Sequence, residues 1–145
     1  MNKYNNIYSR CATIGSYGTI CLPFAAIPAC GVSVYTVVGR ANDNETLYLS
    51  PVGQMEAGYA YIYKTEYPYA RFLRLNKGEV KHPVEGQPLL GTFSFAPSLS
   101  RNARVLVGDV WYPALRGITI AANCACLMLA NTPVETGGVA MKIVK

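Results

Sequence analysis

The chain has 145 residues, of which 51% are hydrophobic and only 14% are charged, and its formal net charge is +5. A chain of this length forms one domain whose core is large enough to be stable without a disulfide or a metal ion. Charged residues usually make up about 25% of a globular domain. We therefore expect a single domain over residues 1–145, part of whose surface packs against other protein.

Short runs rich in Val, Ile, Tyr, Phe and Thr recur along the chain, and Gly, Pro and Asn separate them. Helical periodicity is almost absent. The pattern predicts an all-β domain, an antiparallel two-sheet sandwich with a jelly-roll-like or barrel-like fold as the alternative. The expected strands cover residues 7–11, 18–22, 33–38, 46–50, 57–63, 71–75, 89–94, 104–107, 110–112, 124–129 and 139–144.

Breaks between these strands are marked by proline, glycine and asparagine. Pro23 and Pro28 cannot donate to a central ladder, so residues 24–30 are expected to form a loop or a bulged edge. Residues 42–44, 76–78 and 107–109 are expected to form turns. Prolines and polar residues also interrupt the two uncharged stretches, 11–39 and 117–134, so we predict no membrane span.

Residues 57–63 and 122–128 align with each other as AGYAYIY and ANCACLM. Gly58 and Asn123, the second residue of each segment, are the two residue types that most readily adopt positive φ. The alignment places Tyr61 and Cys126 in equivalent positions. It predicts two related halves packed as two sheets, and coincidence in a β-rich sequence is the alternative.

Five cysteines form an odd set, so at least one is unpaired within a monomer: Cys11, Cys21, Cys30, Cys124 and Cys126. The last two are separated by one residue and should point to the same side of a strand. A metal site would need further ligands at suitable spacing, and the chain has one histidine. We predict no metal and no cofactor, with the cysteines serving as small buried hydrophobes in a reducing compartment.

Catalytic patterns are missing from the sequence. His82 precedes Pro83 without a nucleophile motif such as G-x-S-x-G nearby, and the acidic residues fall mostly at expected turns and strand ends. A minor hydrolase centred on His82 would need a carboxylate or thiol next to its ring. The chain is predicted not to be an enzyme, and no catalytic residue is assigned.

Tyrosine occurs 11 times and is the stronger functional signal. Alternation along the strand expected at 57–63 places the rings of Tyr59, Tyr61 and Tyr63 on one face. Tyrosine suits contact surfaces because it has an apolar ring and a polar tip. Such a face could bind a glycan or a protein, or it could be a half-buried structural face. The candidate binding residues are Tyr59, Tyr61, Tyr63, Tyr67, Tyr69 and Trp111, the last of which could equally anchor the core.

Basic residues are loosely spaced over one part of the chain, ahead of the single histidine. A nucleic-acid site would gather such residues on one face with stacking aromatics between them, so nucleic acid is not the expected partner. The patch could steer an acidic protein toward this surface. Its members are Arg71, Arg74, Lys77 and Lys81.

Four short motifs occur in a fixed order: GTICLPF at residues 18–24, MEAG at 55–58 leading into YIY, LGTF at 90–93, and AN at 122–123 leading into a strand. In this order they resemble the β-rich module found repeatedly in secreted and cell-surface proteins of Bacteroidetes-type gut bacteria. The similarity covers roughly residues 17–129. It implies an extracellular structural or adhesive role, and no catalytic residues belong to such modules.

The chain begins with Met1 and a polar segment without the apolar core of a signal peptide. A surface module without a leader could leave the cell within a phage particle. We therefore expect a virion structural protein, either a capsid decoration or a fibre-associated protein, and the alternative is a secreted or cell-surface adhesin that binds carbohydrate. The expected partner is protein, either another copy or an acidic shell or envelope protein.

Overall fold

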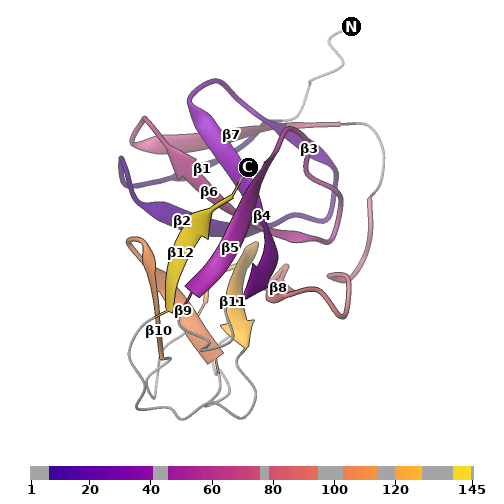
Figure 1. Cartoon of the computed structure of the whole chain (residues 1–145). Coiled ribbons are helices and arrows are strands. Elements are labelled where there is room, and N and C mark those ends of the chain that lie inside the picture. Colours follow the sequence, from indigo (N-terminus) through magenta and orange to yellow (C-terminus); the bar gives the residue numbers. More distant parts are fainter. Residues whose placement is uncertain are drawn as a thin grey trace, which may run out of the picture.

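The computed structural model describes residues 7–40, 46–75, 79–94, 103–113, 120–128 and 139–144, and this part of the chain is all β (Figure 1). None of it forms a helix with the length and apolar character needed to cross a membrane. The strands in chain order are β1 (Ile7–Cys11), β2 (Tyr17–Cys21), β3 (Ala26–Pro28), β4 (Val32–Arg40), β5 (Thr46–Val52), β6 (Ala60–Thr65), β7 (Tyr69–Arg74), β8 (Leu89–Thr92), β9 (Ala103–Val107), β10 (Val110–Pro113), β11 (Cys124–Met128) and β12 (Val139–Ile143).

Each predicted strand has a counterpart in the structure, and β3 is the strand that the sequence did not predict. The prediction of an edge is confirmed, because β3 is a three-residue strand at the edge of its sheet, where it pairs with β7 and ends at Pro28. The turn predicted at 107–109 is confirmed, with Gly108 at a φ of 66° between β9 and β10. The turns predicted at 42–44 and 76–78 lie outside the described residues.

Nine strands form one sheet that is nearly closed into a barrel, in the order β2-β6-β4-β5-β12-β10-β9-β11-β8. A separate antiparallel sheet has the order β1-β7-β3. The predicted sandwich of two antiparallel sheets is therefore wrong in detail, since β12 pairs with β5 in parallel. The barrel-like alternative describes the larger sheet.

The strand order of the large sheet reads the same from both edges toward β12. The first half consists of β2, β4, β5 and β6, which are its first to fourth strands when they are taken as β2, β4, β5, β6 in chain order. From the edge inward they lie as β2, β6, β4, β5, that is, first, fourth, second and third. The second half uses β8, β9, β10 and β11 in the same relative order. A two-fold rotation through β12 and perpendicular to the sheet would exchange the halves and reverse strand direction. A strand on this axis must be parallel to one neighbour and antiparallel to the other, as β12 is to β5 and β10.

The repeat seen in the sequence matches this symmetry, because β6 and β11 are the fourth strands of the two halves. Gly58 and Asn123, just before them, both have positive φ, at 81° and 61°. The equivalence of Tyr61 and Cys126 is also confirmed, since both are buried on the outer side of the barrel wall. The two halves form one barrel wall and not two facing sheets, because β12 joins their inner edges.

Where β2 meets β11, the wall is closed by side chains and a single backbone bond. The Thr19 hydroxyl donates to the Ala125 carbonyl at 3.1 Å and accepts from the Ala125 N–H at 2.9 Å. The Asn123 side-chain amide donates to the Cys21 carbonyl at 3.2 Å, and the Cys21 N–H donates to the Asn123 carbonyl at 2.9 Å. Side-chain bonds thus take the place of part of the ladder at this seam.

Two apolar cores lie on the two sides of the wall formed by β2, β4 and β6. Alternation along β6 directs Ala60 and Ile62 into the barrel and Tyr61 and Tyr63 toward the small sheet. The barrel core contains Cys21, Leu47, Leu49, Ala60, Ile62, Leu89, Trp111, Ala125, Leu127 and Val139. The second core contains Ile20, Leu22, Ala26, Val34, Met55, Tyr61, Tyr63, Ala70 and Phe72.

Arg10 on β1 ties the small sheet to the seam of the barrel. Its guanidinium donates to the carbonyls of Thr19 and Asn123, both at 2.8 Å, and to the Tyr8 hydroxyl at 2.8 Å. It also lies over the Tyr63 ring, 5.8 Å from its centroid. Because five donors are held in a rigid fork, one arginine can satisfy acceptors from several elements.

Candidate functional site

The outer face of the small sheet carries exposed apolar and aromatic side chains together with an arginine. The register of β1, β7 and β3 aligns Ile7, Leu73 and Ile27 across one end of this face. Ile7 is 54% exposed. Tyr69 and Arg71 continue along the same side of β7, since alternate residues of a strand share a face.

Tyr67, Tyr69 and Arg71 form a stack on this face. The rings of Tyr67 and Tyr69 are 5.5 Å apart and inclined by only 10°, and the Arg71 guanidinium lies 4.3 Å from the Tyr69 centroid. Tyr67 rests against Gly31, which has a φ of 88° and whose missing side chain leaves room for the ring. Both tyrosines stay about two-fifths exposed, at 40% and 38%. We call these three side chains the aromatic stack.

The backbone around the aromatic stack is held in place by hydrogen bonds. The Thr65 hydroxyl donates to the Tyr69 carbonyl at 2.9 Å and accepts from the Tyr67 N–H at 3.2 Å. The Glu66 N–H donates to the Gly31 carbonyl at 3.0 Å. The backbone that carries the stack is therefore fixed by bonds within the chain, and a preformed surface lowers the entropic cost of binding.

The predicted three-tyrosine face is not a free surface. Tyr61 and Tyr63 are 6% and 5% exposed and pack under the small sheet, where Tyr63 meets Phe72 edge-on with centroids 5.6 Å apart. The Tyr61 hydroxyl accepts from the Glu56 N–H at 2.8 Å. Tyr59 alone of the three is exposed, at 43%. The sheet covering this face could not be foreseen from alternation within one strand.

Trp111 is likewise placed in the core and not on a binding surface. Its side chain is fully buried in the barrel between β9 and β12, where its Cα partners are Leu106 and Val139. Trp111 therefore anchors the core, as the alternative interpretation of the sequence had it, and does not form a platform for a ligand.

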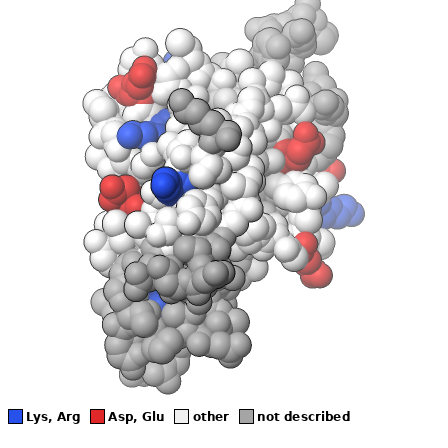
Figure 2. Space-filling model, viewed as in Figure 1, with Lys and Arg blue, Asp and Glu red and all other residues white. Residues whose placement is uncertain are grey.

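The predicted basic residues do not gather into one patch. Arg71 belongs to the aromatic stack, while Arg74 pairs with Glu79 at 2.8 Å and lies over the Phe24 ring. Lys81 is exposed, and Lys77 lies outside the described residues. On the face of the molecule drawn in Figure 2, the charged side chains are few and are scattered among neutral ones.

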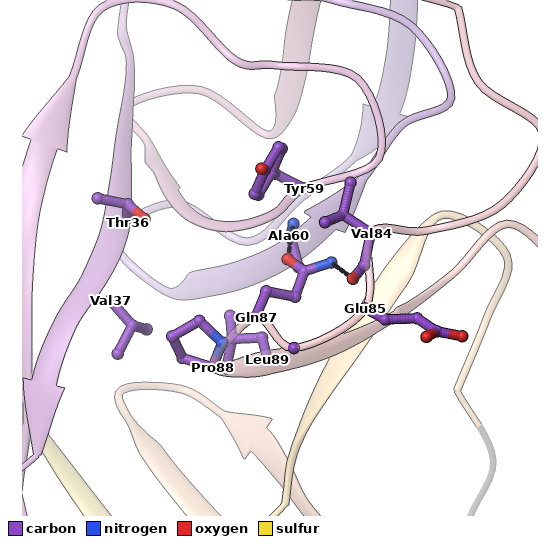
Figure 3. A pocket seen from close by; sticks show the side chains of 10 residues that line it. Thr36, Val37, Tyr59, Ala60, Val84, Glu85, Gln87, Pro88 and Leu89 are labelled. Carbon is purple, nitrogen blue, oxygen red and sulfur yellow. Dashed lines mark hydrogen bonds between the residues drawn. The ribbon is translucent and has the colours of Figure 1, made fainter.

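A hollow of about 270 Å³ lies where the loop before β8 crosses the start of β6 (Figure 3). Tyr59 and Val84 stand on one side of it and Val37 and Pro88 on another. Gln87 closes its floor with every amide atom engaged: Oε1 accepts from the Ala60 N–H at 2.6 Å, and Nε2 donates to the carbonyls of Gly58 and Val84. Gln87 therefore fixes the loop against the start of β6.

His82 is exposed on the same loop. No carboxylate or thiol among the residues described hydrogen-bonds its ring, so they supply no partner for the hydrolase considered above. The described ranges also contain no group of three or more His, Cys, Asp or Glu residues that could hold a metal ion.

All five cysteines are free, and they differ in exposure. Cys21 and Cys126 are buried as predicted, whereas Cys11 and Cys30 are exposed on the edges of the small sheet and Cys124 is intermediate. Burial, and then the nearby Cys124, raises the pKa of the Cys21 thiol to about 12, and burial raises the pKa of the Cys126 thiol. The prediction of small buried thiols is wrong for Cys11 and Cys30.

This difference predicts the order of thiol modification. With Ellman's reagent at pH 8, we expect Cys11 and Cys30 to react quickly and Cys21 to react only on unfolding, as read by peptide mass spectrometry. Burial in the folded chain raises the pKa of the Cys21 thiol from its ordinary value of 9.0 to about 12. Its contribution to stability is therefore complete below pH 9 and is lost progressively toward pH 12. Fast labelling of Cys21 in the folded protein would contradict its placement in the barrel.

Comparisons with protein-family models, characterised proteins and solved structures find no match to this chain. The resemblance of the four sequence motifs to a bacterial surface module therefore stays a prediction. Two residues were not singled out from the sequence as structural supports: Arg10, which ties the small sheet to the barrel, and Gly31, which makes room for the Tyr67 ring. Their roles depend on contacts between segments that are distant in the chain.

Proposed function

We propose that this chain is a non-catalytic binding module that works through protein–protein contacts made by the outer face of its small sheet. The observation that carries the proposal is the aromatic stack of Tyr67, Tyr69 and Arg71, which is exposed and stands on backbone held by hydrogen bonds. Tyrosine and arginine dominate the energetic centres of protein interfaces. The partly exposed Ile27 and Leu73 and the exposed Ile7 would extend the contact.

The first partner that we propose is a second copy of the chain, and an acidic shell or envelope protein is the second. A charged fraction of 14% supports extensive packing against protein, and a net charge of +5 favours an acidic neighbour. The proposed setting is a virion, as a capsid decoration or fibre-associated protein. A secreted or cell-surface setting is the alternative that the motif resemblance supports.

The test is the concentration dependence of self-association, measured by sedimentation velocity from micromolar to millimolar chain. The double variant Tyr69→Ala, Arg71→Ala is expected to weaken association by about 30-fold or more, the effect of removing an interface hot spot worth ~2 kcal/mol. Tyr112→Ala is the matched control, since Tyr112 is 47% exposed on β10 of the barrel. Equal weakening by both variants would refute the assignment of this face. A chain that stays monomeric at millimolar concentration would refute self-association.

Carbohydrate binding is a second candidate, and the exposed Tyr59 ring at the hollow of Figure 3 is the observation that favours it. Sugars stack on the faces of aromatic rings, and Tyr61 and Tyr63 have no exposed face to offer. A glycan array probed with the chain and with Tyr59→Ala decides this. A signal that the substitution removes would support glycan binding, and no signal would exclude it for the glycans present.

A further inference from the structure

β12 differs from the other strands of the barrel because it belongs to neither half. It lies between the two inner edges, parallel to β5 over Ala140–Ile143 and antiparallel to β10 over Val139 and Ala140. The first half pairs β5 with β4 and the second half pairs β10 with β9, both without help from β12. Each half therefore has its own ladder, and β12 is the strand that joins them.

Side chains contribute little to holding β12 in this position. Only Val139 of its five residues is buried, whereas five of the six residues of β6 are buried. Met141 is partly buried against the barrel core, Ala140 and Lys142 are exposed, and Ile143 is 40% exposed. Most of the attachment is thus backbone hydrogen bonding, to which Val144 adds a bond from its N–H to the Leu49 carbonyl at 2.7 Å.

Backbone bonding of this kind has two consequences. A ladder does not depend on which chain supplies the strand, since every residue other than proline offers the same donor and acceptor. If β12 leaves, the edges of β5 and β10 are both unpaired, and unpaired edges recruit another strand. The strand that fits best is the same segment from another copy, because its Val139 fills the space beside Trp111.

We propose that β12 is exchanged between two copies of this chain, so that the β12 of each copy completes the barrel of the other. The contacts in the exchanged dimer are those already present in one chain, so exchange costs little at high concentration. The partner is a second copy, and the surface it occupies is the slot between β5 and β10. The exchange does not depend on the aromatic stack of the small sheet.

The test mixes two versions of the full chain, one carrying Thr46→Cys and the other Ala140→Cys with a tag that separates their masses. These residues are Cα partners on β5 and β12, and neighbouring strands about 4.8 Å apart allow a disulfide. Both chains also carry Cys11→Ser and Cys30→Ser, which remove the exposed thiols. The mixture is held at millimolar concentration, oxidised, and analysed on a non-reducing gel.

The matched control mixes chains carrying Thr36→Cys and Ser50→Cys, which are Cα partners on β4 and β5 of the same half. We expect disulfide-linked dimers of unlike chains for the β5–β12 mixture, several-fold more than for the control. Equal yields from the two mixtures, at urea concentrations up to the unfolding midpoint, would overturn the proposal. A dimer formed through the small sheet would also give equal yields of disulfide-linked dimer from the two mixtures. Equal yields therefore refute strand exchange without refuting self-association through the small sheet, which the sedimentation experiment tests separately.

A second variant keeps the proposal testable if either single substitution weakens folding. One chain carrying both Thr46→Cys and Ala140→Cys, oxidised at low concentration, has β12 locked to its own β5. Locking is expected to abolish the exchanged dimer, and a reducing agent is expected to restore it. A dimer that is equally abundant in the locked and reduced chains would refute strand exchange.

Discussion

Replacing Trp111 by alanine is expected to lower the free energy of unfolding by about 3–5 kcal/mol, the usual cost of removing a large aromatic side chain from a core. Trp111 is fully buried in the barrel, and its strand neighbours Leu106 and Val139 come from strands on both sides. The cavity left by alanine would therefore loosen the contact that anchors β12. Urea unfolding followed by circular dichroism measures the change.

Two variants separate burial from local disturbance of β10. Trp111→Phe keeps most of the volume and removes an indole N–H that has no acceptor among the described residues, so its cost should be well below that of alanine. Tyr112→Ala changes the next residue, which points outward, and its cost should stay within about 0.5 kcal/mol. Similar losses for Trp111→Ala and Tyr112→Ala would show that the barrel does not enclose the indole.

Arg10→Ala is expected to be the most damaging change of a charged residue on the small sheet, at about 2–4 kcal/mol, because it removes the guanidinium that donates to the Thr19 and Asn123 carbonyls and leaves Asn123 with the Cys21 N–H as its remaining donor. The substitution weakens the bonding at the seam between β2 and β11 and also the packing of β1. Hydrogen exchange should therefore show faster exchange of the Cys21 amide, which donates to Asn123 across this seam.

Arg71→Ala is the control for the seam, since Arg71 lies on the opposite, solvent-facing side of the same sheet. Its effect on stability should be small, because an exposed cation over an aromatic ring contributes about 0.5–1 kcal/mol. Arg10→Lys should fall between the two, since one ammonium keeps the charge but cannot match the fork that reaches three acceptors. Equal stability of Arg10→Ala and Arg71→Ala would contradict the role given to Arg10.

Local pattern was enough to predict the presence of two related halves and each described strand except β3, but the predicted packing of these halves as two sheets was wrong. Alternating apolar residues located β6 and β11, and the residue types of Gly58 and Asn123 predicted their positive φ. These features depend on a few neighbouring residues and on backbone sterics. The missed strand, β3, is three residues long and contains Pro28, so it offers no period from which to recognise it.

The candidate site depended on tertiary contacts that local pattern does not contain. Tyr61 and Tyr63 share a strand face as expected, but that face lies under β7 and not in solvent. Tyr67 and Tyr69 were recognised as candidates from the sequence. The position of the Tyr67 ring, however, depends on Gly31, which lies more than thirty residues earlier in the sequence. Parallel pairing of β5 with β12 was equally hidden, since no turn connects them.

The position of β12 on the axis between the halves has a consequence for how the protein matures on the ribosome. The strand follows all the other described strands in sequence, so the barrel cannot close before residues 139–143 have left the exit tunnel. Until then the nascent chain carries two adhesive edges, on β5 and β10, at a time when other nascent chains are near. Folding of this chain should thus be most sensitive to chaperones in the interval before β12 has emerged.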